Sequence, residues 1–225
     1  MTFKDEPHPS NLQKVALCAG ILLGTLFPSL SMSESIAHSL GLDALNGDSS
    51  RQILIVTLSV VYLARFTYAM FVFVKRKISW FEGGMVSLLW FAMFYLYNSS
   101  GGGSSAPIGP IDLAGLLLYI TGSYFNSGAD YQRYAWKRDP GNSDRLCTGG
   151  LFKYSMHINY FGDSLVYFGM AMVAREFMCF VVALVITLNF IFLQIPMQHK
   201  HLRSKYAGEF EEYARRTKRL IPFVY

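Results

Sequence analysis

The chain has 225 residues, of which 52% are apolar and only 16% are charged, and its formal net charge is +5. A soluble domain usually carries about 25% charged residues, so this composition argues against an ordinary soluble protein. The basic residues concentrate in a few loops and in the tail, which accounts for the positive charge without nucleic-acid binding.

Six long apolar runs, each nearly free of charge, follow one another along the chain. A membrane helix needs about 20 mostly apolar residues, with a range of about 17–25. Three runs fall in this range, and three are shorter, which predicts that their ends lie in the membrane interface or partly re-enter. The runs occupy residues 15–31, 53–74, 83–97, 111–125, 160–174 and 177–197.

The loops between these runs alternate in charge. Residues 34–51 are mainly acidic and residues 98–110 carry no charge, whereas residues 75–77 and the tail after Gln198 are basic. The positive-inside rule then places both termini in the cytosol. We predict an all-α polytopic membrane protein of about six transmembrane helices, with a cytosol-facing cofactor cleft and a C-terminal amphipathic helix. It would form one domain of residues 1–225 in a bacterial inner membrane or the endoplasmic reticulum.

Three further features predict no additional site. The polar stretch of residues 1–13 predicts no cleavable signal peptide, and the Gly/Ser-rich segment 99–105 predicts a flexible connector. The cysteines, Cys18, Cys147 and Cys179, have no metal-ligand spacing, so they predict buried free thiols and no metal site.

Arg65 stands inside the second apolar run, where a charge is expensive and usually faces a cavity or a partner. Tyr62 precedes it by three residues and lies on the same side of a helix. Its hydroxyl could donate a hydrogen bond to a carbonyl within the membrane. The alternative is that Arg65 forms an ion pair with Glu82, Asp112 or Asp163 that only holds helices together.

One helical face leaves the fourth run and carries Asn126, Asp130, Arg133 and Lys137. A carboxylate or amide suits sugar hydroxyls, and Arg or Lys suits phosphate, so this face predicts a nucleotide site. The alternative is a solvated amphipathic stripe with internal ion pairs.

Polar residues also gather where the fifth run begins. Lys153, His157, Asn159 and Asp163 lie within eleven residues and lead straight into apolar sequence. Because an unpaired polar group in hydrocarbon costs several kcal/mol, this cluster predicts the lining of a polar cofactor cavity. The alternative is an ordinary juxtamembrane loop in which His157 and Asn159 cap a helix.

The tail continues the sixth run as a basic helix. Binding of anionic headgroups is one interpretation. The other is that the pair His199 and Arg203, or the pair His201 and Lys205, closes over a pyrophosphate, since each pair is spaced i, i+4.

The segment Gly150-Leu-Phe-Lys-Tyr-Ser-Met-His-Ile-Asn-Tyr-Phe-Gly-Asp163 resembles the signature Gly-Leu-(Trp/Phe)-x-Tyr-Ser-Arg-His-Pro-Asn-Tyr-x-Gly-Glu. That signature belongs to the steroid 5-alpha-reductase C-terminal-domain superfamily. The resemblance extends to residues 62–82, 126–137 and 211–223, and in all it spans roughly residues 55–225. The combination is specific for the superfamily and not for the substrate.

The resemblance implies a cofactor site. In the superfamily, the residues that match Asn126, Asp130 and Asn159 contact NADPH, and the acid that matches Asp163 belongs to the same wall. Related sterol reductases also use NADPH, whereas related isoprenylcysteine and phospholipid methyltransferases use S-adenosylmethionine in the same region.

The resemblance also implies roles in phosphate and substrate binding. Basic and His residues of the last membrane helix cover the phosphates, and His199, Lys200 and His201 are the candidates here. A Tyr in a Tyr-x-x-Arg context, here Tyr62 with Arg65, hydrogen-bonds the substrate carbonyl.

The chain departs from the signature at three positions: Met156 replaces Arg, Ile158 replaces Pro, and Asp163 replaces Glu. Losing the Arg removes a fixed phosphate-binding cation. Steroid reductases also use an early-helix Glu to polarise the ketone, and the first apolar run contains no acid. These departures argue against a conventional 3-keto steroid substrate.

The prediction is a membrane-embedded NADPH-dependent reductase of a carbon–carbon double bond in a lipid-like, steroid or isoprenoid, enone. Its partners would be that small molecule and membrane lipids, with no nucleic acid. The alternatives are an S-adenosylmethionine-dependent membrane methyltransferase and a non-catalytic lipid-binding membrane protein. Arg133 and Lys137 favour the phosphorylated cofactor.

Overall fold

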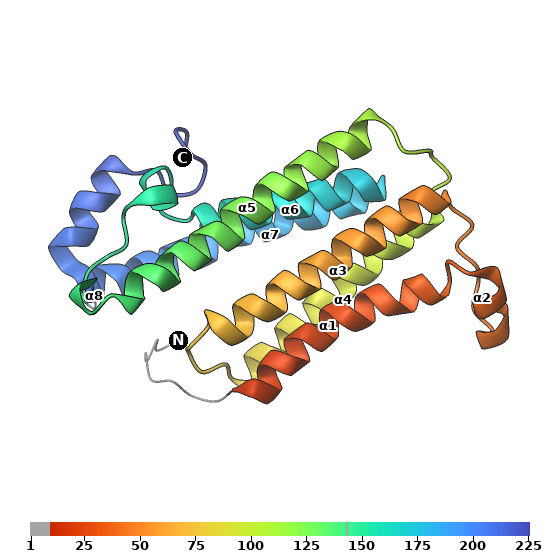
Figure 1. The fold of residues 1–225 in the computed structure, drawn as a ribbon, viewed down its shortest axis with the longest axis horizontal. Helices are drawn as coiled ribbons and strands as arrows, with labels where there is room; N and C mark the ends of the chain where they lie inside the picture. The colour runs from red at the N-terminus through yellow and green to blue at the C-terminus, as the bar shows by residue number, and fades with distance from the viewer. Residues whose placement is uncertain (1–9, 143) are drawn as a thin grey trace. The chain divides into compact units, whose positions relative to one another are not determined.

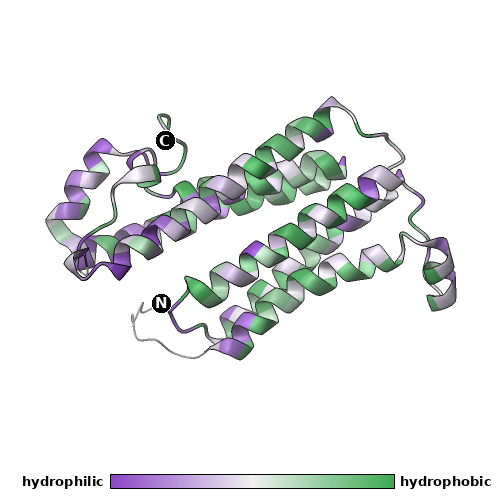
Figure 2. Cartoon of the chain, viewed as in Figure 1, coloured by the Kyte–Doolittle hydropathy of each residue, from purple (hydrophilic) through white to green (hydrophobic). Residues whose placement is uncertain are grey.

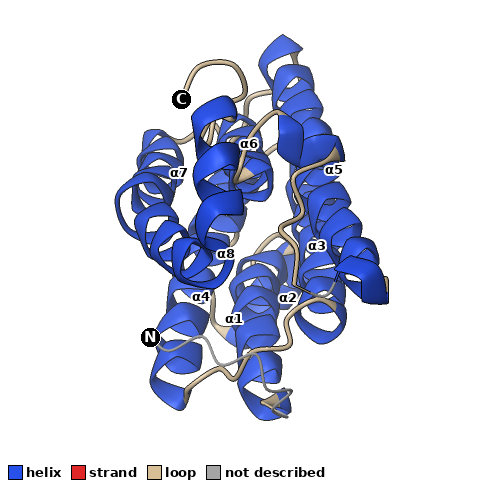
Figure 3. Ribbon diagram, turned by 90° about the vertical axis from the view of Figure 1, so that its left-hand side faces the viewer, coloured by secondary structure: helices blue, strands red, loops and turns tan. Residues whose placement is uncertain are grey.

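The computed structural model describes residues 10–142 and 144–225. Residue 143 and residues 1–9, part of the polar stretch expected to lack a signal peptide, lie outside the described residues. The described residues form helices and loops, with one isolated bridge between Ser155 and Lys218 and no strand (Figure 3). The all-α prediction is confirmed.

The six apolar runs fall largely within helices, which Figure 1 shows in chain order. Two short 3₁₀ turns, η1 (Pro140–Asn142) and η2 (Gly150–Lys153), and a π-helical turn, η3 (Phe190–Gln194), accompany them. The α-helices are α1 (Asn11–Leu30), α2 (Glu34–Leu40), α3 (Ser49–Val72), α4 (Trp80–Gly103), α5 (Pro110–Arg138), α6 (Ile158–Ala174), α7 (Phe177–Asn189) and α8 (Ile195–Arg216).

Three helical stretches among the described residues are long and apolar enough to cross a membrane: α1, α3 and the continuous stretch Phe177–Arg216. Large apolar side chains are also exposed on other helices, with Leu88 of α4 67% and Leu117 of α5 66% accessible. Such surfaces suit hydrocarbon better than water. Figure 2 shows the contrast with the second half of α8, which is largely hydrophilic. The chain is an integral membrane protein, and the number of six spans stays a prediction.

The Gly/Ser-rich segment predicted as a flexible connector is mostly helical instead, because α4 continues to Gly103. Gly101 and Gly102 are buried there. A Cβ added to Gly102 would lie 2.5 Å from Met32, and one added to Gly101 would lie 3.2 Å from Ile55. These glycines therefore allow close packing, which the sequence pattern did not distinguish from flexibility.

The chain divides into two compact units, so each is described by itself. The first comprises Met1–Leu117 and Phe168–Val182, and the second comprises Leu118–Tyr167 and Ala183–Tyr225. Helices α5, α6 and α7 contribute residues to both units. The single domain expected from the sequence stays a prediction.

A buried charge network holds helix ends together in the first unit. The Arg51 guanidinium is fully buried and donates hydrogen bonds to Asp112, to the carbonyls of residues 106 and 107, and to the Val173 carbonyl. Arg175 Nη2 lies 2.6 Å from the second Asp112 oxygen. The network connects the starts of α3 and α5 to the end of α6.

In the second unit, α5 and α6 approach so closely that only glycine fits between their backbones. A Cβ on Gly122 would lie 2.4 Å from the Gly162 carbonyl oxygen, and one on Gly162 would lie 2.5 Å from the Asn126 nitrogen. This contact brings the polar face of α5 against the start of α6.

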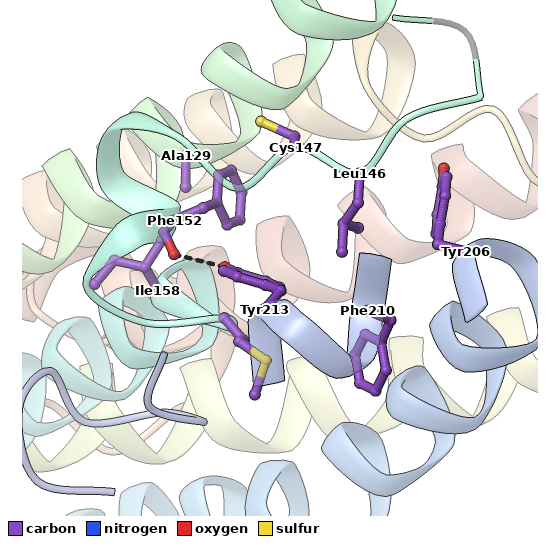
Figure 4. Close-up of a cluster of buried hydrophobic side chains, with 9 residues drawn as sticks. Ala129, Leu146, Cys147, Phe152, Ile158, Tyr206, Phe210 and Tyr213 are labelled. Atoms are coloured by element: carbon purple, nitrogen blue, oxygen red, sulfur yellow. Dashed lines mark hydrogen bonds between the residues drawn. The ribbon is translucent and has the colours of Figure 1, made fainter. Parts of the chain in front are cut away.

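A cluster of buried apolar side chains joins the loop before α6 to the second half of α8 (Figure 4). Tyr213 fixes this arrangement, because its hydroxyl donates a 2.5 Å hydrogen bond to the Phe152 carbonyl. The cluster contains Ala129, Leu146, Cys147, Phe152, Met156, Ile158, Tyr206, Phe210 and Tyr213.

Helix α8 is kinked in its middle. Ala207 has φ 35° and ψ −110°, which no helix accommodates. The kink lets the second half turn back, so that the Phe210 ring lies edge-on to the His199 ring at 5.2 Å between centroids. The C-terminal strap, which we define as residues 217–225, follows α8.

Candidate functional site

A cavity of about 570 Å³ lies in the second unit, and we call it the cationic cavity. The π-helical turn η3 and the first half of α8 form most of its wall, and the C-terminal strap adds one residue. The described residues that line it are Ile191, Ile195, Pro196, His199, Lys200, Arg203, Ser204 and Arg219. The chemistry of this set favours an anionic ligand.

The local sequence explains how α8 presents these side chains. His199 and Arg203 are one helical turn apart and share a face, as their spacing predicts. The turn η3 precedes them and contains an extra residue per turn, an irregularity that often occurs at functional sites. His201, the third candidate of this segment, is not among the described lining residues.

His157 does not line the cavity but packs against His199, which does. Its ring stacks on that of His199, with 5.1 Å between centroids and 25° between planes. Tyr160 stacks on His157 with centroids 5.4 Å apart. Burial, together with the nearby His199 and Arg133, lowers the pKa of His157 to about 3, so the ring is neutral at pH 7.

Both imidazoles have an unsatisfied ring nitrogen. The Nε2 atoms of His157 and His199 are buried and have no hydrogen-bond partner among the described residues. Buried polar atoms in native proteins are nearly always paired, so the orphaned nitrogen of His199, which lines the cavity, points to a ligand. The juxtamembrane alternative also has a basis, because His157 does directly precede α6 and its carbonyl accepts from the Phe161 amide.

Backbone hydrogen bonds bring the C-terminal strap to this wall. The Met156 amide donates to the Lys218 carbonyl at 2.8 Å, and the His157 amide donates to the Arg219 carbonyl at 3.2 Å. The Ser155 hydroxyl adds a 2.7 Å bond to the Leu220 carbonyl. Sequence patterns missed Arg219, because pairing across some sixty residues leaves no local signal.

The Met156 side chain is buried in the apolar cluster. The position that carries Arg in the resembling signature therefore offers no cation here. Arg219 lies next to it through the backbone pairing and does face the cavity.

The polar face of α5 meets α6 as the close backbone contact requires. Asn126 Nδ2 donates to the Asn159 carbonyl at 3.3 Å. Asp130 and Arg133 form an internal ion pair with 2.6 Å between Oδ1 and Nη2, which is the pairing expected for a solvated stripe. Lys137 lies exposed at the end of this face. Asp163 follows Asn159 by one turn of α6 and is half-buried.

Tyr62 and Arg65 belong to the first unit, whereas all the cofactor candidates belong to the second. The Arg65 guanidinium lies 5.9 Å from the centre of the Tyr62 ring, so the two share a helix side as predicted. Tyr62 is 3% exposed and packs among Phe66, Trp90 and Phe94.

Two of the acids considered as ion-pair partners of Arg65 are engaged elsewhere. Glu82 binds Arg76, and Asp112 binds Arg51 and Arg175.

Comparisons with known proteins agree with the signature. Residues 74–217 match the family described as protein of unknown function DUF1295. The chain is 30% identical over 115 residues to 3-oxo-5-alpha-steroid 4-dehydrogenase 1 of Rattus norvegicus, which covers 51% of this chain and 42% of that protein. It is 29% identical over 114 residues to the steroid 5-alpha-reductase DET2 of Gossypium hirsutum, covering 50% and 42%.

Human 3-oxo-5-alpha-steroid 4-dehydrogenase 2 is 29% identical over 111 residues, covering 49% of this chain and 42% of that protein. The matched part therefore spans less than half the length of these curated relatives. The family match itself covers well over half of the chain. The chain belongs to the DUF1295 family and is a steroid 5-alpha-reductase-like superfamily member.

Proposed function

We propose that this protein is an NADPH-dependent reductase of a carbon–carbon double bond conjugated to a carbonyl in a lipid-like substrate. The observation that carries the proposal is the cationic cavity, where three cations and the orphaned His199 imidazole line one space and the orphaned His157 imidazole stacks on His199. The distant likeness to steroid reductases supports the same reaction class.

The donor set fits this cofactor. Lys200, Arg203 and Arg219 would hold its phosphates, because charge-assisted hydrogen bonds to phosphate are the strong ones. The buried Nε2 atoms of His199 and His157 would gain the partners that they lack. S-adenosylmethionine carries a cationic sulfonium and no phosphate, so the same set suits it poorly.

The remaining candidate residues would orient the cofactor. Asn126 supports the backbone at Asn159, which keeps the start of α6 in place, while Asp130 and Asp163 offer carboxylates for sugar hydroxyls. Bound NADPH supplies the hydride, and the protein supplies binding, orientation and exclusion of water.

The substrate end of the reaction is assigned to Tyr62. Its hydroxyl would donate a hydrogen bond to the substrate carbonyl as negative charge develops on that oxygen. The Arg65 guanidinium beside the ring would favour the same negative charge.

The test is ligand-dependent stabilisation of the purified protein in a neutral detergent. NADPH at about 100 times its Kd should stabilise the fold by about 2.7 kcal/mol, or roughly 5–10 °C in Tm. The double variant Lys200→Gln with Arg203→Gln should lose the shift. Arg216→Gln is the matched control, because Arg216 contacts Glu212 and does not line the cavity.

The other ligands distinguish the alternatives. A shift with S-adenosylmethionine alone would favour a methyltransferase, and a shift with neither would favour a non-catalytic lipid-binding protein. If NADPH binds, a screen of lipid enones for NADPH oxidation should identify the substrate class.

A further inference from the structure

The three cations of the cationic cavity come from two segments that are distant in the sequence. Lys200 and Arg203 lie on α8, while Arg219 lies on the C-terminal strap. Backbone hydrogen bonds from Met156 and His157 and a side-chain hydrogen bond from Ser155 fasten the strap, so Arg219 is positioned beside His157. The strap thus contributes Arg219 to the wall of the cavity.

The three cations differ in whether an acidic side chain neutralises them. Arg203 is ion-paired to Glu211, which lies beyond the α8 kink. Neither Lys200 nor Arg219 has an ion pair among the described residues, and the Arg219 guanidinium lies 5.9 Å from the centre of the Tyr225 ring. Lys200 of α8 and Arg219 of the C-terminal strap therefore line one cavity without an acidic side chain in the described part of the chain to neutralise them. A ligand with at least two negative charges would bind both and relieve their repulsion.

We propose that Lys200 and Arg219 form a clamp on a phosphate of the ligand, and that phosphate binding fastens the C-terminal strap against α8. The clamp rests on the proposed function, since it names Arg219 as the second anchor of that cofactor. Arg203 already has an acidic partner in Glu211, so the clamp itself requires only Lys200 and Arg219, and Arg203 adds a third contact to the phosphates.

Binding of inorganic pyrophosphate tests the clamp without any turnover. Isothermal titration in neutral detergent should give measurable binding to the wild type. Arg219→Gln and Lys200→Gln should each weaken it about 10–100-fold, because each removes a hydrogen bond to a charged group. Arg219→Lys should restore part of the loss by keeping the charge.

Lys218→Gln is the matched control. Lys218 neighbours Arg219 and is also exposed, but it does not line the cavity. The affinity of the Lys218→Gln variant for pyrophosphate should stay within about twofold of that of the wild type. The Tm of ligand-free Arg219→Gln should equal that of Lys218→Gln, which separates lost binding from lost folding.

Amide hydrogen exchange tests separately whether ligand binding fastens the C-terminal strap. The Met156 and His157 amides donate to the Lys218 and Arg219 carbonyls, so pyrophosphate should slow their exchange in the wild type and not in Arg219→Gln. The Arg51 amide, in the first unit, should be unaffected. Trypsin cleavage after Lys218 should slow in parallel.

The outcomes separate the clamp from the proposed function. If Arg219→Gln binds pyrophosphate like the wild type while Lys200→Gln does not, the clamp is overturned and the cofactor site stands. If neither pyrophosphate nor NADPH binds the wild type, both fail. A phosphate could also come from a lipid headgroup. If phosphatidic acid micelles bind in a way that depends on Arg219, and NADPH does not bind, the phosphate comes from a lipid headgroup. That outcome would overturn the proposal that a nucleotide supplies it.

Discussion

Tyr62 is the residue on which the proposed chemistry depends most. Its ring packs among aromatic side chains and is nearly inaccessible, so Phe would preserve the packing and remove only the hydroxyl. Tyr62→Phe should keep NADPH binding and lower kcat by about 10²–10³-fold, because an oxyanion donor is lost. Steady-state kinetics with the enone found by screening measure this. Full activity in Tyr62→Phe would remove Tyr62 from the mechanism.

His157 predicts a pH dependence of stability. Its pKa is about 3 in the folded protein, whereas an unfolded His titrates near 6.5. Above about pH 6.5 both states are neutral there. Between about pH 6.5 and pH 3 the unfolded state binds the proton first, so folding stability falls as the pH is lowered.

The fall should reach about 1.4 kcal/mol per pH unit for this one group. Thermal unfolding of the wild type and of His157→Phe between pH 7 and pH 4 measures it, and the variant should show a shallower decline. Parallel curves for the two proteins would show that His157 does not hold a depressed pKa.

The buried charge network predicts how strongly the stability of the fold depends on Arg51 and on Arg175. Removing one partner of a buried ion pair leaves an uncompensated charge and typically costs about 3–5 kcal/mol. Arg51→Met should therefore destabilise the fold strongly, since Arg51 also satisfies three carbonyls. Arg175→Met should cost less, because the Arg175 side chain is 26% exposed and Arg51 remains to neutralise Asp112. Tm values compared under one detergent condition check the order.

The contact between α5 and α6 depends on Gly162. An added methyl there would meet the backbone of Asn126, and overpacking of this kind costs about 1–3 kcal/mol. Gly162→Ala should lower the Tm and weaken NADPH binding, because the start of α6 carries Asn159.

Gly84→Ala is the control for that experiment, since a Cβ at Gly84 of α4 meets nothing within 4 Å. Alanine is the better helix former there, by about 1 kcal/mol, so this variant should be neutral or slightly more stable. Equal losses in both variants would point to a general effect of helix composition rather than to the α5–α6 contact.

The charges of the loops set the expected orientation of the whole chain in the membrane. The loop charges predict that both termini are cytosolic and that the loop after α4 lies on the opposite side. A cysteine placed at the exposed Ser105 of a variant without the natural cysteines should react with an impermeant thiol reagent added from outside. A C-terminal tag should be reachable only after the membrane is opened. Labelling of Ser105→Cys only from the cytosolic side would overturn the six-span arrangement.

The sequence by itself determined the class of the molecule, because long apolar runs leave a chain few choices in a bilayer except to form helices. It also determined the short-range arrangements. The pair Tyr62 and Arg65 and the pair His199 and Arg203 lie together as helical spacing requires. The signature between Gly150 and Asp163 placed the chain in its superfamily, and the family match agrees.

Only the tertiary structure decided which polar groups meet. The approach of α5 to α6 at Gly122, the stacking of His157 on His199 and the delivery of Arg219 by the C-terminal strap all join residues far apart in the chain. The same is true of Arg51, whose partners lie up to 122 residues away. Such contacts depend on how helices pack and on backbone pairing between irregular segments. Neither leaves a periodic trace in the sequence, so the cavity and its cations emerge only when the chain is folded.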